Sequence, residues 1–259
     1  MNRQVLVLGD AEIPYVDVRG AQDGPHLTVL AGVHGTEYTS IAAVREFAAG
    51  LDPDRLAGRV TAVPLVNPEA FWARSPFVVP GDGKNLNRCF PGDPVGSSTD
   101  ALASALFDRF VVGSDYLLDL HAGDLPEALE PFAMYEASTV EAAARELALA
   151  SGLGHVVRQV AAHRTVAGSS CAAAADIGIP AIIAESGQNG LLDRASVERH
   201  LASLVNVARH LGVLPGQVVR HPAPQEHEGW HRLRTPVAGW WEPAVQSGSR
   251  WRPGRCSAR

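Results

Sequence analysis

Short runs of apolar residues alternate along the chain with longer stretches rich in alanine and leucine. Short apolar runs bounded by turn residues are typical of buried strands, and apolar residues three and four apart are typical of amphipathic helices. The pattern predicts strands at His26–Val33, Arg59–Val66, Asp115–Leu120, Phe132–Tyr135, His155–Val160 and Ala181–Ala184. It predicts helices at Thr39–Ala49, Ala101–Val112, Val140–Ala150, Ser170–Ile177 and Ser196–Leu211. This alternation indicates an α/β fold in which helices cover a sheet.

Two segments depart from the alternation. Residues Asn67–Asp100 are rich in Pro, Gly, Asn and Asp and show no clear periodicity. A long loop inside a compact domain is usually functional or disordered. After about Val213 the composition changes to Pro, Gly, Trp and Arg. We therefore expect a main domain over residues 1–214, followed over residues 215–259 by a linker and the start of an incomplete β-rich segment.

Length, charge and cysteine content narrow the classes of function. A chain of 259 residues can bury a sizeable core. The net charge of −6, without a long run of one sign, argues against nucleic acid or an anionic membrane as a partner. Neither a signal peptide nor an apolar stretch of about 18 residues is evident. Together with three widely spaced cysteines, Cys89, Cys171 and Cys256, this predicts a cytoplasmic protein that acts on small molecules, and a homo-oligomer is left open.

Three predicted strands run into a residue that can bind metal or transfer protons. HLTVLAGV is followed by His34, DYLLDL by His121 and PAIIA by Glu185. In open sheets with mostly parallel strands, ligands bind outside the carboxyl ends of the strands, so these three side chains can meet there. A single histidine at a strand end is more often a hydrogen-bonded structural residue, and it is the set of three that indicates a site.

A second candidate ligand, Glu37, follows His34 by three residues, at the first turn of an expected helix. Side chains at this spacing point to the same side, so His34 and Glu37 can share one ion. Zinc accepts imidazole nitrogen and carboxylate oxygen, and catalytic sites combine three protein ligands with an open position. His34, Glu37 and His121 therefore form a complete set for one Zn²⁺ per chain. The alternative for Glu37 alone is an acid that complements the helix dipole.

Two carboxylates lie close to these ligands in the sequence. Asp119 precedes His121 by two residues, and residues two apart on a strand share a face, so Asp119 can hold the ligand imidazole. A bond from Asp119 to the backbone is the alternative. Glu185 follows an apolar strand and precedes the flexible turn Ser-Gly-Gln-Asn-Gly. A partly desolvated carboxylate beside zinc can shuttle protons, which makes Glu185 the candidate general base.

The segment DGKNLNRCFPG places Asn85, Asn87 and Arg88 close together in the region without periodicity. The planar guanidinium of arginine suits a substrate carboxylate or a developing oxyanion, and a neighbouring asparagine adds a directed amide. These three residues are candidates for substrate binding, and Arg88 is a candidate for catalysis as well. The alternative is a solvated polar loop that asparagine turns hold in place.

Five motifs, AGVHGTE, PLVNPEAF, DGKNLNRCFPG, LLDLHAG and GIPAIIAESG, occur in this order within Leu27–Leu214. With them the sequence resembles the succinylglutamate desuccinylase/aspartoacylase family, a branch of the zinc carboxypeptidase-like clan. The resemblance implies a mixed, largely parallel sheet flanked by helices, and a zinc hydrolase catalytic domain over residues 1–214. It matches His34, Glu37 and His121 to the zinc ligands, Glu185 to the base, and Asn87 with Arg88 to the pair that grips the substrate.

The resemblance also implies a reaction. Members of the family remove an acyl group from an amino-acid-like amine, and some relatives deacetylate derivatives of diaminobutyrate. We therefore expect zinc-dependent hydrolysis of the amide bond of a small N-acyl amino acid or N-acyl amine. Two alternatives stay open: a zinc carboxypeptidase or amidase that acts on short peptides, and a metal-binding module that has lost catalytic turnover.

Two features depart from the family pattern. Many relatives carry an arginine shortly before the DGKNLNR-like segment, where it polarises the scissile carbonyl, whereas Phe77 stands near that place here. Arg74 is the candidate substitute, and the zinc ion is the other source of oxyanion stabilisation. Relatives also continue into a β-rich C-terminal domain, and TPVAGWWEPAVQSGSRWRPG resembles its opening.

Overall fold

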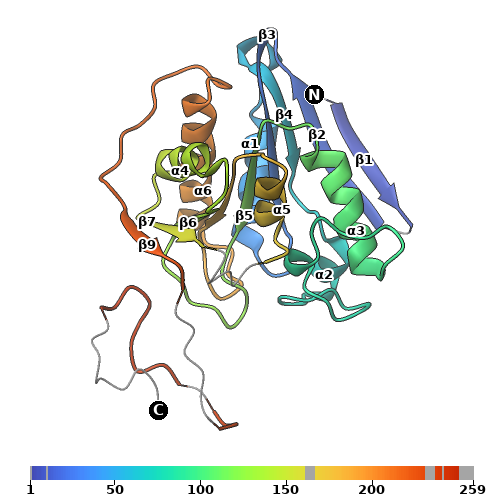
Figure 1. Ribbon diagram of the computed structural model, residues 1–259, viewed down its shortest axis with the longest axis vertical. Coiled ribbons are helices and arrows are strands. Elements are labelled where there is room, and N and C mark those ends of the chain that lie inside the picture. Colours follow the sequence, from blue (N-terminus) through green and yellow to red (C-terminus); the bar gives the residue numbers. More distant parts are fainter. Residues whose placement is uncertain (1, 10, 161–166, 231–236, 241, 251–259) are drawn as a thin grey trace.

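A mixed β-sheet forms the centre of the molecule (Figure 1). The structure is a computed structural model that describes all residues except 1, 10, 161–166, 231–236, 241 and 251–259. In the described part of the chain, nine strands follow the order β1-β2-β4-β3-β5-β8-β6-β7-β9. Their bounds are β1 Asn2–Leu8, β2 Ala11–Arg19, β3 Gln22–Ala31, β4 Ala57–Val63, β5 Tyr116–His121, β6 Phe132–Glu136, β7 His155–Gln159, β8 Ala181–Glu185 and β9 Gln225–Glu228.

Strand direction divides the sheet into a parallel centre and two sides. The neighbours β4, β3, β5 and β8 are parallel. On one side, β2 is antiparallel to β4 and forms a hairpin with β1. On the other side, β6 runs antiparallel to β8, and β7 and β9 are each parallel to the strand before them in the sheet. The expected mixed, largely parallel sheet is confirmed, although β1, β2 and β9 are not among the strands predicted from the sequence pattern.

Helices cover both faces of the sheet (Figure 1). The core on one face joins the strands to α1 (Tyr38–Ala49), α4 (Glu141–Ala150) and α6 (Arg194–His210). The core on the other face joins them to α3 (Ser98–Leu106) and α5 (Ser170–Asp176). Successive strand residues alternate between the two cores, as Val29 and Leu30 do. None of the described helices combines the length and the apolar character that crossing a bilayer requires.

The segment Asn67–Asp100, which has no clear periodicity, contains a short helix, α2 (Pro68–Ala73), and a 3₁₀ turn at Leu86–Arg88. Both are too short for a periodic pattern to show in the sequence. The helix predicted at Ala101–Val112 begins earlier, because Ser97 and Asp100 form a capping box before α3. Its last part is a π-helical segment, Phe107–Val111.

The chain returns to the sheet after α6. β9 pairs with β7, and its Glu226 accepts two hydrogen bonds from Arg145 of α4, at 2.9 and 2.6 Å. This strand lies beyond the boundary expected at Leu214. The division into residues 1–214 and 215–259 stays a prediction, and part of the expected β-type segment lies outside the described residues.

Candidate metal centre and active site

The carboxyl ends of β5 and β8 place His121 and Glu185 next to each other. Each is the last residue of its strand, and the two are register partners. Leu117 and Ile183 belong to the core beneath α5, and residues two apart on a strand share a face. His121 and Glu185 therefore project from this same face of the sheet, on strands about 4.8 Å apart.

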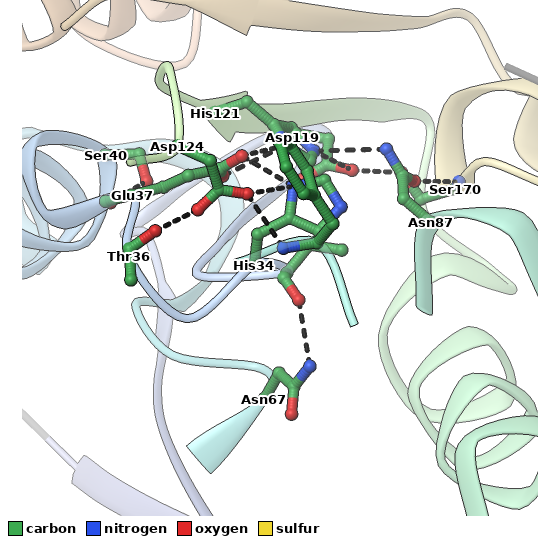
Figure 2. A network of polar contacts seen from close by, with 12 residues as sticks. His34, Thr36, Glu37, Ser40, Asn67, Asn87, Asp119, His121, Asp124 and Ser170 are labelled. Carbon is green, nitrogen blue, oxygen red and sulfur yellow. Dashed lines mark hydrogen bonds and ion pairs between the residues drawn. The ribbon is translucent and has the colours of Figure 1, made fainter. Parts of the chain in front are cut away.

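His34, Glu37 and His121 form a compact cluster (Figure 2). His34 follows β3 by three residues, and Glu37 immediately precedes α1. Glu37 Oε1 lies 2.6 Å from His34 Nδ1 and 3.2 Å from His121 Nδ1. One ligand atom from each residue lies within 4.8 Å of the others, and the described residues contain no second cluster of three metal-binding side chains with this spacing.

The outer nitrogen of each imidazole meets an oxygen acceptor. His34 Nε2 lies 3.1 Å from Asn85 Oδ1, and His121 Nε2 lies 3.1 Å from Asp119 Oδ2. An acceptor at Nε2 favours a proton there and leaves the Nδ1 lone pair for an ion. Asp119 in turn accepts a hydrogen bond from the Ser170 hydroxyl. Both histidines are thus oriented with Nδ1 toward Glu37.

The charges in this cluster match a bound cation. Burial by itself would raise the pKa of Glu37, but His121 and His34 lower that pKa to about 2. Burial would lower the pKa of each histidine, yet Glu37 raises both, and Asp119 raises the pKa of His121 further. Glu37 Oε2 is buried and accepts no well-directed hydrogen bond from the described residues. A buried carboxylate with a spare lone pair and two oriented imidazoles fits a zinc ion.

The turn that carries His34 and Glu37 is anchored to α2. Asn67 donates from Nδ2 to the Val33 carbonyl at 2.9 Å, and its Oδ1 caps α2 by accepting from Ala70 N at 3.2 Å. A Cβ added at Gly35 would lie only 2.1 Å from the Ala70 carbonyl oxygen, so only glycine allows this approach. The role of Asn67 was not inferred from the sequence, although an asparagine before a proline is a known start signal for a helix.

Asp124 is a second residue that sequence reasoning did not identify. Its side chain is fully buried, accepts from the Thr36 hydroxyl and from Phe77 N at 3.0 Å, and lies 3.7 Å from His34 Nδ1. Burial, and then Glu37, raise the pKa of this carboxyl group. Asp124 therefore ties the ligand turn to the turn at Phe77, whose φ of 61° lies in the left-handed region.

A cavity of about 520 Å³ opens onto the cluster. Its polar lining comes from the cluster, from the loop after α2, and from Glu127 and Glu185. Its apolar wall includes Phe77, Leu129, Phe132, Met134, Ile183 and Trp230. Trp230 follows β9, and its ring centroid lies 5.0 Å from that of Phe132 in an edge-to-face contact. Trp230 was not inferred from the sequence as a site residue.

The predicted substrate-binding residues differ in their placement. Asn85, Asn87 and Arg88 line the cavity, whereas Arg74 is exposed and is not among the residues that line it. Asn87 is buried, with Oδ1 accepting from Ser170 N at 3.2 Å and Nδ2 at 3.4 Å from His121 Nε2. Arg88 is exposed and donates from Nη1 to the Asn87 carbonyl at 2.7 Å.

Glu185 is partly buried and lines the same cavity as the cluster, and its Oε2 atom is buried with no hydrogen-bond partner among the described residues. Burial, opposed by His121 but reinforced by Glu37, Glu127 and Asp119, raises the pKa of Glu185 well above its usual range. A carboxylate that is desolvated in this way binds a proton readily, which is the property a proton shuttle needs.

The fold and the site define an α/β protein with a candidate metal centre and an adjacent acid–base residue at the carboxyl ends of its central strands. The chain belongs to the family described as the succinylglutamate desuccinylase/aspartoacylase catalytic domain, whose family model matches residues 23–211. The family resemblance inferred from the five motifs is thereby confirmed. Members of this family are hydrolytic deacylases that act on amide bonds.

Three relatives illustrate the similarity. The N-alpha-acetyl-L-2,4-diaminobutyric acid deacetylase of Halomonas elongata is 39% identical over 125 residues, which is 48% of this chain but only 36% of that protein. A succinylglutamate desuccinylase/aspartoacylase from Rhodobacter sphaeroides has a TM-score of 0.86 at 26% identity, covering 99% of this chain and 82% of its own. The ectoine utilization protein EutE (DoeB) from Ruegeria pomeroyi, with product bound, has a TM-score of 0.82 at 24% identity and covers 99% and 80%, which supports the shared fold.

Proposed function

We propose that the chain hydrolyses the amide bond of a small N-acyl amino acid or N-acyl amine, with one zinc ion held by His34, Glu37 and His121. The observation that carries this proposal is the cluster itself, in which one nitrogen from each of two histidines and a carboxylate oxygen lie within 4.8 Å of one another, in a cavity that Glu185 also lines. The membership of the chain in a family of amide-bond deacylases supports the reaction class.

The protein's own residues divide the chemistry between them. A zinc ion in this cluster would polarise a water molecule and the scissile carbonyl. Glu185, whose unpartnered Oε2 lies in the same cavity, accepts a proton from the attacking water and returns it to the departing nitrogen. The amide C–N bond breaks, and the products are a carboxylate and an amine.

Arg88 binds the carboxylate of the substrate. A guanidinium can donate two parallel hydrogen bonds to a carboxylate, and Arg88 lines the cavity from the 3₁₀ turn. Asn85 orients an imidazole, since its Oδ1 contacts His34 Nε2, and Asn87 lines the same cavity with its Oδ1 accepting from Ser170 N. The side chain of Phe77 cannot polarise a carbonyl, and its backbone N–H is already used by Asp124.

One experiment tests the proposal as a whole. Purified protein is analysed for bound metal and then, loaded with zinc, is offered a panel of N-acyl amino acids, N-acyl diamines and short peptides, with products identified by mass spectrometry. We expect about one zinc per chain and release of an amine from members of the first two groups. Cleavage of peptides alone would support the carboxypeptidase alternative, and zinc binding without any turnover would support the metal-binding alternative.

A further inference from the structure

Two adjacent serines at the start of α5 have different partners. The Ser169 hydroxyl accepts from Ala172 N at 3.1 Å and caps the helix. The Ser170 hydroxyl instead donates to Oδ2 of Asp119, a residue of β5. Both serines are fully buried. The first serine therefore has a role within α5, whereas the second joins α5 to the strand that ends at His121.

The Asp119 oxygen that accepts from Ser170 also meets the proposed ligand His121 (Figure 2). Asp119 Oδ2 lies 3.1 Å from His121 Nε2. Within the described part of the chain, Asp119 forms no ion pair with an arginine or lysine, and its Oδ1 is buried without a hydrogen-bond partner. A buried carboxylate is costly unless hydrogen bonds hold it. The Ser170 hydroxyl is thus the neutral donor that fixes the direction in which this carboxylate faces.

The direction of the Asp119 carboxylate in turn affects the His121 ring. An acceptor at Nε2 favours a proton there and leaves the Nδ1 lone pair for an ion, and this Nδ1 lies 3.2 Å from Glu37 Oε1. Groups that hold ligand imidazoles in this way are commonly worth a factor of roughly 10–100 in metal affinity or activity. Ser170 therefore reaches the proposed metal ligand through a single intermediate residue.

The backbone around Ser170 supports the turn that carries Arg88. Ser170 N donates to Asn87 Oδ1 at 3.2 Å, and the Gly168 carbonyl accepts from Phe90 N at 2.9 Å. Gly168 has a φ of 78°, and a Cβ there would lie 2.3 Å from the Arg88 carbonyl oxygen, so the two segments meet closely. Contacts to the ligand thus use the Ser170 hydroxyl, whereas contacts to the turn use the backbone.

We propose that Ser170 is a positioning residue for the metal centre: its hydroxyl holds Asp119 so that His121 presents Nδ1 to the zinc ion. This role rests on the proposed function, which supplies the metal and its three ligands. It goes beyond that function because it adds a residue that contacts neither the ion nor the substrate. The sequence pattern identifies Ser170 only as the start of a helix.

The zinc dissociation constant, measured by competition with a chromophoric chelator, tests this role without a substrate. Ser170→Ala removes the hydroxyl and keeps the backbone contact to Asn87, so we expect zinc affinity to fall about tenfold or more. Ser169→Ala is the matched control, because it removes the neighbouring hydroxyl that caps α5. It should lower the melting temperature of the metal-free protein and change zinc affinity less than about twofold.

A double-mutant cycle with Asp119→Ala shows whether Ser170 acts through Asp119. Without the carboxylate, the Ser170 hydroxyl has nothing to hold, so Ser170→Ala should cause little further loss of zinc affinity in the Asp119→Ala background. Steady-state kinetics at saturating zinc add a second readout. We expect Ser170→Ala to lower kcat and to change KM less than about twofold, because the turn that carries Arg88 keeps its backbone support.

Different failures have different meanings. Wild-type zinc affinity in Ser170→Ala, equal losses in the two serine variants, or independent losses from Ser170→Ala and Asp119→Ala would each overturn the proposed role and leave the proposed function intact. A wild-type protein that binds zinc but hydrolyses no member of the substrate panel would count against the proposed function, while the comparison of zinc affinities would still decide the role of Ser170. Absence of zinc binding by the wild type would count against both.

Discussion

Glu185 is the register partner of His121, so a candidate base stands beside a candidate metal ligand on neighbouring parallel strands. Their separation is set by the hydrogen bonding of the sheet rather than by a loop. His121 is buried and Glu185 is partly buried in the folded protein, and the strands that carry them have helices packed on both faces. A side-chain substitution at either position should therefore change the chemistry while the backbone stays in place.

Metal content should depend on the cluster. We expect wild-type protein to retain about one zinc per chain and the His34→Ala and His121→Ala variants to lose it, because each removes one of three ligands. Elemental analysis after extensive dialysis gives the occupancy. His155→Ala, which alters a histidine on β7 outside the cluster, is the matched control and should retain zinc. Full occupancy in the His34→Ala/His121→Ala double variant would rule out this site.

Glu185→Gln should separate the base from the ligands. Glutamine keeps the shape of the side chain but cannot take a proton from water, so kcat should fall by ~10²–10⁴-fold while zinc stays bound. Oε2 of Glu185 has no hydrogen-bond partner among the described residues, so the melting temperature should not fall.

Three measurements on this variant distinguish three roles. Loss of zinc in parallel with activity would make Glu185 a ligand. A lower melting temperature with normal activity per folded molecule would make it a structural carboxylate. An active, zinc-loaded Glu185→Gln enzyme would show that the proposed proton transfer is wrong.

Arg88→Lys should weaken turnover although it keeps the positive charge. A lysine cannot present two parallel donors to a carboxylate, so we expect kcat/KM to fall roughly tenfold, equivalent to about 1.4 kcal/mol. Steady-state kinetics with a carboxylate-bearing substrate provide the measurement. Arg194→Lys, at the exposed start of α6, serves as the control for the substitution itself. Equal kcat/KM values for wild type and Arg88→Lys would exclude a bidentate contact.

Asp82 should stabilise the loop that carries Asn85, Asn87 and Arg88. Its carboxylate accepts from Thr99 N at 3.0 Å, from the Thr99 hydroxyl at 2.6 Å and from Lys84 N at 3.1 Å, which joins the loop to the first turn of α3. Asp82→Asn turns one of these acceptors into a donor. Asp82 thus helps to cap α3, and we expect the loss of this contact to lower the free energy of unfolding by about 1 kcal/mol at pH 7.

The effect of Asp82 should depend on pH. Burial tends to raise the pKa of Asp82, but hydrogen bonds from Thr99, Ser97 and Lys84 outweigh it and hold the pKa well below its usual range. Because the folded-state pKa is the lower one, the stabilisation is complete above the unfolded-state value of about 4 and is lost as the pH falls below it. Urea unfolding of wild type and Asp82→Asn should converge toward pH 3, with Asp23→Asn as an exposed control. If the difference in the free energy of unfolding between wild type and Asp82→Asn stayed constant between pH 3 and 7, this explanation would be contradicted.

The parts of the structure that were predictable are those that depend on local sequence. The runs that end near His34, at His121 and at Glu185 are strands in the central parallel part of the sheet, where burial on both faces makes a strand continuously apolar. The edge hairpin of β1 and β2 was missed, since Val5 and Val7 are exposed and Pro14 lies within β2. A strand that is not buried on both faces lacks this apolar signal.

The residues that support the site were harder to predict because their partners are distant in sequence. Asp124 meets Thr36 across 88 positions, and Trp230 reaches Met134 across 96. Neither contact has a periodic or motif signature, because it exists only once the sheet has formed. Arg74, in contrast, lies close to the DGKNLNR segment in the chain, but α2 ends at this residue, which is exposed and does not line the cavity.

The reversed direction of β6 separates the site into two parts that can change independently. Its first residue, Phe132, pairs with Glu185, the last residue of β8. The proposed ligand His121 and the proposed base Glu185 lie at the carboxyl ends of central strands, and His34 and Glu37 lie on the turn after β3. Glu127 and Leu129 lie in the loop that leads into β6. Exchange of this loop would change one part of the cavity wall and retain the proposed ligands and base. Such an arrangement would let this part of the cavity wall vary in sequence while the strands that hold His121 and Glu185 stay unchanged.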